Sequence, residues 1–203
     1  MESKLFTPVT FGPLTLRNRT IRSAAFESMC PGNAPSDMLL DYHRSVAAGG
    51  IGMTTVAYAA VTQSGLSFDR QLWMRPEIIP GLRRLTDAIH AEGAAAGIQL
   101  GHCGNMSHKS ICGCMPVGAS SGFNLYSPTF VRGLRADELP EMARAYGRSV
   151  NLAREAGFDS VEIHAGHGYL ISQFLSPSTN HRKDEFGGSL QNRMRFLDMG
   201  LGE

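Results

Sequence analysis

The run of residues 51–60, IGMTTVAYAA, constrains the fold more than any other feature of the chain. It is apolar almost without interruption, which is typical of a strand buried on both faces of a parallel sheet. Residues 20–25, residues 95–101 and the residues leading into His164 indicate three further strands. Segments with apolar residues at helical spacing lie between them. Strands that alternate with helices predict an α/β fold with a parallel sheet.

Helices are predicted over residues 37–48, over residues 76–91, from Asp137 to Gly157, and from about Ser189 onward. Ser36 can cap the first of these helices, and Asp137 can cap the third. Residues 5–19 predict a β-hairpin around Gly12-Pro13. Residues 102–136 form a long excursion rich in Gly, Ser and Pro, whose length favours a functional role. The order is therefore a hairpin followed by four βα units.

Composition narrows the class of protein. The chain has 203 residues, of which 42% are hydrophobic, and a net charge of +1, which suits one globular domain with a substantial core. The balanced charge provides no basic face for nucleic acid. No apolar run approaches the length of a membrane span, and the N-terminus lacks an apolar signal core. We therefore expect a soluble cytoplasmic protein.

The four cysteines are Cys30, Cys103, Cys112 and Cys114. Without an export signal they argue against a disulfide framework. Three of them lie close to His102 and His108, so a metal site in the 102–114 loop is conceivable. Their spacing matches no common metal-binding pattern, and we expect free thiols and no metal.

His164, His167 and Tyr169 follow the last predicted strand within six residues. Two imidazoles can donate hydrogen bonds to one oxygen, and a phenol beyond them can supply a proton. Such a group could polarise a carbonyl or phenolate oxygen and protonate a neighbouring carbon. A single histidine at such a place would be as consistent with packing as with chemistry.

Other candidates lie where the earlier strands end. In a βα barrel the functional groups collect at the carboxyl ends of the strands. Gln99 is an amide inside an apolar strand, and a buried amide needs a partner, either a ligand or a structural group. The remaining candidates are Ser23, Ala24, Ala25 and Phe26 after the first strand, and Tyr58 at the end of the second.

The stretch from Val161 to Phe196 carries a family resemblance. It reads H-x-x-H-G-Y-L, then F-L-S-P, N-x-R, D-x-F-G-G-S and N-R-x-R-F. This series closely resembles the old yellow enzyme family of FMN-dependent oxidoreductases, the NADH:flavin oxidoreductases that include ene-reductases and 2,4-dienoyl-CoA reductase-like enzymes. The resemblance implies a (β/α)8 TIM barrel with an N-terminal hairpin, of which residues 1–203 form the N-terminal half with four βα units.

The resemblance also implies roles for individual residues. Ser23, Ala24, Ala25, Phe26 and Tyr58 would contact FMN, and Gln99 would bond its pyrimidine edge. His164 and His167 would hold the substrate oxygen, and Tyr169 would protonate the substrate carbon. NADH or NADPH would reduce the flavin, and the substrate would be a small activated alkene, either an enone or a dienoyl thioester.

The chain departs from the family pattern at two places. Phe26 stands where relatives carry Thr or Cys beside the flavin N5, and it cannot hydrogen-bond the flavin O4. Residues 102–105, His-Cys-Gly-Asn, lack the Arg that relatives often carry there.

The resemblance covers only the first half of the family's barrel. We therefore expect residues 1–203 alone to hold FMN weakly and not to turn over. We also expect them to associate through open sheet edges and to leave Val56, Ile98 and Ile163 without an opposing layer. The alternatives are a non-catalytic half-barrel that needs a second half, and a metal-binding module based on the 102–114 loop.

Overall fold

The computed structural model describes residues 3–202 and divides into two compact units. Unit 1 contains the residues up to Ala59, together with Arg70–Gln99 and Asn151–Glu162. Unit 2 contains Ala60–Asp69, Leu100–Val150 and the residues from Ile163 onward. The chain passes between the units several times, so each is built from segments far apart in sequence.

The predicted hairpin is confirmed in unit 1. Strand β1 (Val9–Phe11) pairs antiparallel with β2 (Leu14–Leu16), and Phe11 lies opposite Leu14 across the turn. Gly12 occupies the turn with a φ of 54°, a conformation that favours glycine.

The central parallel sheet has the strand order β3-β4-β5-β9. Strands β4 (Met53–Ala60), β5 (Ala95–Gly101) and β9 (Ser160–Ile163) lie where the sequence predicts them. Within residues 3–202, β3 and β9 each pair along one edge only. The first and fourth strands are therefore the outer strands, as expected, and association through them stays a prediction.

The first strand is much shorter than predicted. Strand β3 contains only Ile21–Arg22, and Ile21 is 45% exposed, so the prediction of a buried strand over residues 20–25 is wrong. Side chains replace the missing strand pairing. The Arg22 guanidinium donates to the Thr55 carbonyl (2.7 Å), and a Glu27 carboxylate oxygen accepts from the Ala57 N–H (3.2 Å). A longer β3 would compete for these main-chain groups of β4.

Glu27 is the centre of a buried polar cluster in unit 1. One carboxylate oxygen lies 2.9 Å from the Arg22 guanidinium and 2.9 Å from His43 Nε2. His43 is fully buried, and its Nδ1 lies 2.8 Å from Thr54 Oγ1. Because Arg22 and Glu27 bracket residues 23–26, the cluster holds both ends of that segment against β4.

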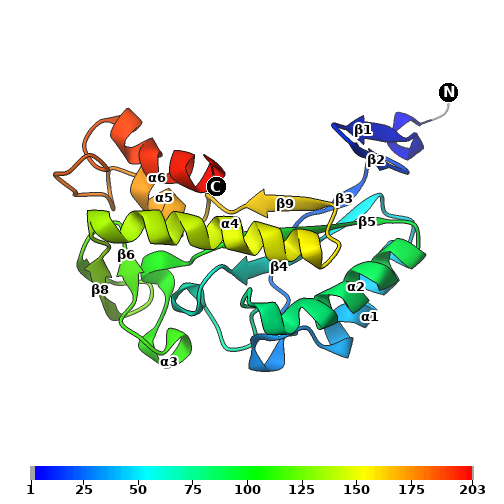
Figure 1. The fold of residues 1–203 in the computed structure, drawn as a ribbon, viewed down its shortest axis with the longest axis horizontal. Helices are drawn as coiled ribbons and strands as arrows, with labels where there is room; N and C mark the ends of the chain where they lie inside the picture. The colour runs from blue at the N-terminus through cyan, green and yellow to red at the C-terminus, as the bar shows by residue number, and fades with distance from the viewer. Residues whose placement is uncertain (1–2, 203) are drawn as a thin grey trace. The chain divides into compact units, whose positions relative to one another are not determined.

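Two predicted helices cover one face of the sheet in unit 1. Helix α1 (Asp37–Ala48) starts at Ser36, whose Oγ accepts the Leu39 N–H (3.2 Å). Helix α2 (Ile79–Ala91) follows a 3₁₀ turn over Pro76–Ile78. The two helices pack against each other and lie on the same side of β4 and β5 (Figure 1).

The burial of Val56 and Ile98 contradicts the prediction that they would lack an opposing layer. Both side chains are fully buried. Successive residues of a strand point to opposite faces, so these two face the helical layer, and their neighbours Ala57 and Gln99 face the other way. Ile163, in unit 2, is half-buried.

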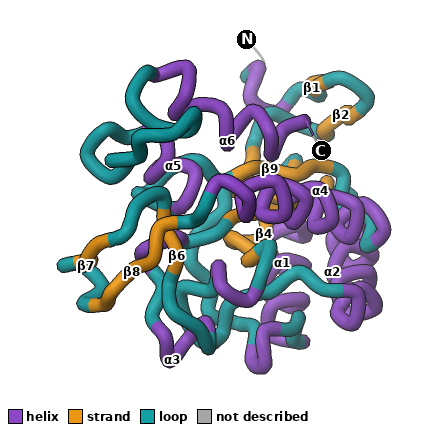
Figure 2. The backbone as a smooth tube through the Cα atoms, turned by 60° about the vertical axis from the view of Figure 1, so that its left-hand side comes forward, coloured by secondary structure: helices purple, strands orange, loops and turns teal. Residues whose placement is uncertain are grey.

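In unit 2 the excursion over residues 102–136 has secondary structure of its own. Helix α3 (Lys109–Cys112) precedes a sheet of order β6-β8-β7, made of Val117–Gly118, Thr129–Gly133 and Gly122–Asn124 (Figure 2). Phe123 and Phe130 lie opposite each other across β7 and β8, with ring centroids 5.2 Å apart. These strands are too short to produce a clear alternating pattern in the sequence.

Helix α4 (Leu139–Glu155) begins after a 3₁₀ turn over Ala136–Glu138 and ends before Gly157. Asp137 lies inside that turn, so the prediction that it caps the helix is wrong. The N-cap position belongs to Arg135, and the carboxylate of Glu138, three residues later, accepts the Arg135 N–H (2.7 Å). The same carboxylate accepts from both arms of the Arg132 guanidinium (2.6 and 3.0 Å).

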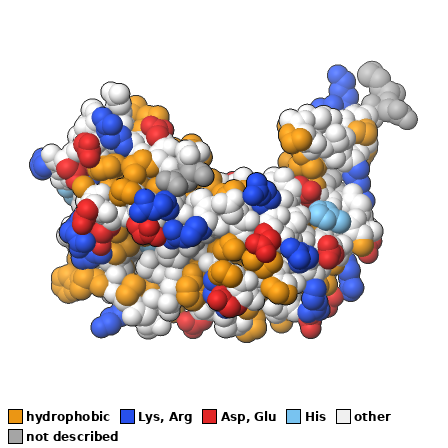
Figure 3. All heavy atoms as spheres, viewed as in Figure 1, with side chains coloured by type: hydrophobic (Ala, Val, Ile, Leu, Met, Phe, Trp, Pro, Cys, Tyr) orange, Lys and Arg blue, Asp and Glu red, His pale blue; other side chains and the backbone are white. Residues whose placement is uncertain are grey.

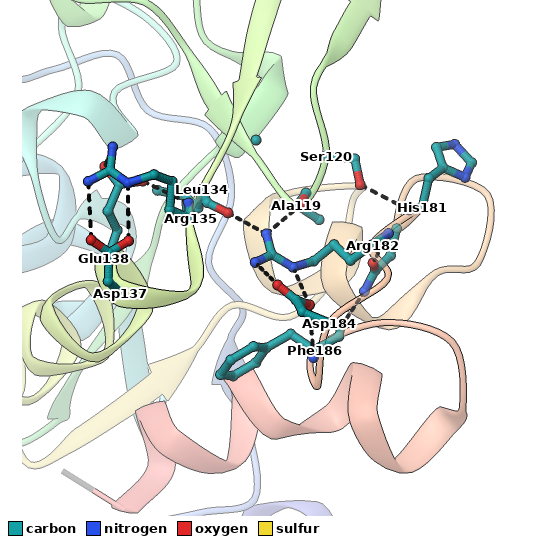
Figure 4. A network of polar contacts seen from close by, with 12 residues as sticks. Ala119, Ser120, Leu134, Arg135, Asp137, Glu138, His181, Arg182, Asp184 and Phe186 are labelled. Atoms are coloured by element: carbon teal, nitrogen blue, oxygen red, sulfur yellow. Dashed lines mark hydrogen bonds and ion pairs between the residues drawn. The ribbon is translucent and has the colours of Figure 1, made fainter.

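The polar motif residues after Leu175 brace a long loop. Helices α5 (Leu170–Leu175) and α6 (Leu190–Gly202) enclose this loop and bring the rings of Phe174 and Phe196 within 4.6 Å. The Arg182 guanidinium donates to the carbonyls of Ala119 and Leu134 and pairs with Asp184 (Figure 4).

Asn180 and Gly187 also stabilise the conformation of this loop. The Asn180 amide donates to the carbonyls of Phe174 and Phe186, both at 2.7 Å. A Cβ on Gly187 would overlap the Arg182 carbonyl. The N-x-R and D-x-F-G-G-S blocks therefore have a structural use in this loop.

The surface carries charges of both signs. On the face shown in Figure 3, basic and acidic side chains are interspersed, and no single-sign area dominates. None of the helices within residues 3–202 combines the length and the hydrophobicity that a membrane-spanning segment requires.

We predict that Glu27→Gln lowers the free energy of unfolding by roughly 3 kcal/mol, because it leaves Arg22 buried without its counterion. The pair is well shielded, with side-chain exposures of 15% and 5%. Urea unfolding measures the loss. The matched control is Asp41→Asn, which breaks the exposed pair with Arg44 (61% and 53%) and should cost about 0.5 kcal/mol or less. Equal losses in the two variants would contradict the account.

Candidate active site

His164 is the first of the three catalytic candidates in unit 2, and it follows β9 directly. Its N–H donates to the Leu100 carbonyl (2.8 Å), and its side chain is 7% exposed. The parallel pairing of β9 with β5 therefore sets the position of this histidine.

His167 lies beside His164, as the sequence predicts. His167 Nδ1 is 3.1 Å from His164 Nε2, and the ring centroids are 4.9 Å apart. The Gly166 N–H points at His164 Nδ1 (3.5 Å). If Nδ1 of His164 accepts this N–H, the proton of a neutral His164 ring lies on Nε2. His164 Nε2–H then donates to His167 Nδ1. His167 then carries its own proton on Nε2, the ring nitrogen that faces away from His164.

The backbone of His167 is unusual. Its φ is 55°, in the left-handed region that non-glycine residues adopt rarely. Gly168 follows with a φ of 70°. Two successive residues in this conformation turn the chain sharply, so that Tyr169 returns toward His164.

Tyr169 completes the group. Its ring centroid lies 5.0 Å from that of His164 and 6.2 Å from that of His167. Burial raises the pKa of the phenol, a hydrogen bond with Ser67 lowers it, and the nearby Cys103 raises it, with a net upward shift. Because the ordinary pKa of tyrosine is about 10, the phenol keeps its proton at neutral pH.

Gln173 supports this turn, and sequence analysis did not single it out. Its amide nitrogen donates to the Gly168 carbonyl (2.6 Å) and lies 2.9 Å from Asn105 Oδ1, while its amide oxygen accepts the Asn105 N–H (3.2 Å). A Cβ on Gly104 would meet this amide at 2.5 Å. The available signal was a glutamine within the apolar helix LISQFL, because a buried amide must find partners.

His102 supports the same turn from β5. Its carbonyl accepts the Leu170 N–H (2.9 Å). Its ring is fully buried, and burial lowers its pKa to about 3, so it is neutral. Gly104 N–H donates to Nδ1 (3.0 Å), which leaves Nε2–H to donate to Ser64 Oγ (3.0 Å). His102 therefore has a structural role in this turn.

The candidates of the first strand lie in unit 1 in an extended segment after β3. Ser23 and Ala25 are exposed, Ala24 is half-buried, and Phe26 is 72% exposed. Their small side chains and the phenyl ring form an accessible surface whose two ends are held by Arg22 and Glu27. Tyr58 is buried in β4, and its carbonyl accepts the Gln71 amide (3.0 Å).

Gln99 lies near the carboxyl end of β5 in unit 1 and is 8% exposed. Its amide nitrogen donates to the carboxylate of Glu162, which is on β9. Sequence analysis did not identify Glu162, although it stands two residues before His164. The bond to Glu162 holds the Gln99 amide in one orientation. The amide oxygen of Gln99 then points away from Glu162 and can accept a hydrogen bond from a ligand.

The structure therefore brings the three catalytic candidates together within unit 2. The six flavin candidates all lie in unit 1. Among the described residues, no three side chains of His, Cys, Asp or Glu gather as metal ligands, so the metal-binding alternative for the 102–114 loop gains no support.

Comparison with known proteins identifies relatives of this chain among flavin oxidoreductases and other reductases. The NADH:flavin oxidoreductase / NADH oxidase family matches residues 4–199. The chain is 42% identical over 192 residues to a 4,4'-dithiodibutanoate disulfide reductase of Rhodococcus erythropolis, covering 95% of this chain and 48% of the relative. It is 38% identical over 202 residues to an NADPH dehydrogenase of Bacillus subtilis, covering 97% and 58%.

Solved structures agree. The old yellow enzyme homologue of Zymomonas mobilis superposes with a TM-score of 0.90 at 30% identity, covering 98% of this chain and 58% of that one. Morphinone reductase in complex with tetrahydroNAD superposes with a TM-score of 0.92 at 28% identity, covering 99% and 60%. The chain thus spans about half to three-fifths of the length of these relatives. Residues 4–199 therefore place the chain in the NADH:flavin oxidoreductase / NADH oxidase family, as the first half of its barrel.

Proposed function

We propose that the chain forms the catalytic first half of an FMN-dependent NAD(P)H oxidoreductase that reduces activated alkenes. The single observation that carries the proposal is the grouping of His164, His167 and Tyr169, with the two imidazoles 3.1 Å apart and the phenol ring 5.0 Å from His164. This group combines an N–H donor for an oxygen, supplied by His167 and oriented by His164, with an acid for a carbon.

The histidine pair suits an oxygen that gains negative charge. When a nucleophile adds to the β-carbon of an enone, charge builds on the carbonyl oxygen. Preorganised donors stabilise that charge where it develops. His167 offers Nε2–H, and it is itself hydrogen-bonded to His164. The hydrogen bond between the rings polarises His167 and keeps it in place, so that little reorganisation is needed.

Tyr169 suits the second half of the addition, in which a carbon must receive a proton. The raised pKa of its phenol keeps it protonated over the physiological range. Its position at the start of α5 is set by main-chain bonds from Tyr169 N–H to Gly166 and from Leu170 N–H to His102. A phenol held in this way can act as a general acid.

The residues of unit 1 fit FMN chemically. The accessible segment of Ser23, Ala24, Ala25 and Phe26 provides a small-residue surface for a flat ring. The Gln99 amide provides a donor and an acceptor that complement a pyrimidine edge, and the Tyr58 backbone lies at the end of the next strand. When bound, FMN supplies the hydride, and the protein supplies position and electrostatics.

The choice of substrate class follows the proposed chemistry. An enone or a dienoyl thioester presents both an oxygen for the histidines and a carbon for Tyr169. Among relatives, the names NADPH dehydrogenase and morphinone reductase indicate nicotinamide-dependent reduction by those proteins. We propose NADH or NADPH as the reductant here.

The tests use a barrel fusion, in which residues 1–203 are joined to the carboxyl-terminal part of the Bacillus subtilis relative that lies beyond the matched region. We predict that Tyr169→Phe leaves flavin reduction by NADPH nearly unchanged and slows alkene reduction about 10²-fold or more. Stopped-flow absorbance separates the two half-reactions. Because the pKa of Tyr169 is raised, the alkene half-reaction should stay flat with pH until above the ordinary tyrosine value of about 10.

The control for this variant is Tyr126→Phe, which alters a tyrosine that is 91% exposed in unit 2. It should leave both half-reactions unchanged. Equal slowing of both half-reactions by Tyr169→Phe would assign Tyr169 a structural role.

We predict that replacing both His164 and His167 by Ala removes phenol binding. A phenolate held over oxidised flavin gives a long-wavelength charge-transfer band, and His167 Nε2–H, kept in place by His164, would donate to its oxygen. Titration of the barrel fusion with a phenol should give this band, and the double variant should not. The control His181→Ala alters an exposed histidine and should preserve it. Unchanged phenol affinity in the double variant would refute the assignment.

A further inference from the structure

Cys112 and Cys114 in unit 2 have no role in the proposed flavin chemistry. Cys112 ends α3 and is 2% exposed, whereas Cys114 is exposed. The two sulfur atoms lie 3.8 Å apart, and the Cys112 thiol also points at the Cys114 carbonyl (3.2 Å). Gly113, with a φ of 74°, turns the chain back between them. The thiols therefore face each other across a tight turn.

A cavity of ≈ 590 Å³ opens at the exposed member of this pair. That volume lies within the range of small-molecule sites. Cys114, Met115 and Met142 of α4 are among the residues that line it. Cys114 therefore stands at the wall of a space large enough for a reaction partner, and Cys112 lies behind it.

The charged residues that line the cavity form ion pairs. Arg132 binds Glu138, Arg135 binds Asp137, and Arg148 binds Glu141 (Figure 4 shows Arg135, Asp137 and Glu138). Hydrogen bonds from Arg132 lower the pKa of Glu138 to about 2, so this pair stays ionised. The lining thus contains three cations and three anions, which suits a zwitterion better than a ligand of single charge.

We propose that Cys112 and Cys114 are a dithiol that exchanges with a small zwitterionic disulfide bound in this cavity. The Cys114 thiolate attacks one sulfur of the disulfide, its S–S bond breaks, and the first thiolate leaves and takes up the proton that Cys114 lost. Cys112 then attacks the Cys114 sulfur, and the second thiol leaves with the proton of Cys112. The cysteines lose two electrons and the small disulfide gains them. This proposal is independent of the flavin chemistry.

The arrangement assigns different roles to the two cysteines. The exposed Cys114 is the attacking thiol, and the buried Cys112 resolves the mixed disulfide. The final sulfur–sulfur distance is about 2.05 Å, so Cys114 must move toward Cys112. Burial and the neighbouring Cys112 raise the pKa of Cys114 to about 11, while Arg132 acts in the opposite direction. The exchange should therefore be slow at neutral pH and faster at mildly alkaline pH, where more thiolate is present.

The test treats the 203-residue chain with excess glutathione disulfide, blocks free thiols and maps the peptides by mass spectrometry. The wild type should lose two hydrogens and carry a Cys112–Cys114 disulfide that dithiothreitol reverses. Cys112→Ser should carry one glutathione on Cys114, because the resolving thiol is gone. Cys114→Ser should carry neither modification.

Cys30 and Cys103 are internal controls. Both are buried, and burial raises the pKa of the Cys30 thiol to about 12, so both should remain unmodified in the folded chain and react in denaturant. Modification of these two under native conditions, or a Cys112→Ser chain without glutathione on Cys114, would overturn the proposal. So would a wild type that stays fully reduced.

The role of the cavity is tested separately with Met142→Trp in the Cys112→Ser background. Filling the cavity should slow modification of Cys114 by glutathione disulfide about fivefold or more. The rate with iodoacetamide, which needs no such space, should not change. Equal effects on both reagents, or no effect on either, would refute the cavity as the binding site.

Discussion

Main-chain hydrogen bonding between parallel strands is the constraint on which the rest of the structure depends. The order β3-β4-β5-β9 places the carboxyl ends of four successive strands along one edge of the sheet. In unit 1 this pairing brings Gln99 of β5 next to Glu162 of β9. In unit 2 it continues as the bond from His164 N–H to the Leu100 carbonyl. The pairing of the strands therefore sets the positions of Gln99 and His164.

Where the ladder ends, side chains bind main-chain groups and hold the loops. Glu27 and Arg22 bind β4 and hold residues 23–26, and Gln173 binds the Gly168 carbonyl and holds the turn between His167 and Tyr169. Arg182 serves the long loop after α5 in the same way. Each of these groups is largely removed from water, so leaving one unpaired is costly. The geometry of the candidate site thus depends on residues that do no chemistry.

Most of the sheet and its helices could be predicted from the sequence, because β4 and β5 are continuous apolar runs and α1 has a clear capping residue in Ser36. The grouping of the three catalytic candidates was predictable as well, because two histidines and a tyrosine follow the last strand within six residues. What could not be predicted depends on contacts between distant residues. Strand β3 stops at Arg22 because Glu27 binds β4. Such a contact leaves no signal in the spacing of apolar residues or in the residues that cap helices. Val56 and Ile98 are buried because helices cover their face of the sheet, whereas their neighbour Gln99 points the other way.

The central claim is that this chain supplies residues that bind and use a flavin. An anaerobic titration of the purified barrel fusion with NADPH and with NADH tests it most directly, followed by the visible band of oxidised flavin. The account predicts one FMN per chain, complete loss of the band with at least one of the two nucleotides, and its return on addition of an enone. It also predicts weaker FMN binding in Gln99→Leu, because the amide that complements the pyrimidine edge is gone. A fusion that binds FMN equally well with Leu at position 99, or whose reduced flavin is not reoxidised by any enone, would contradict the account.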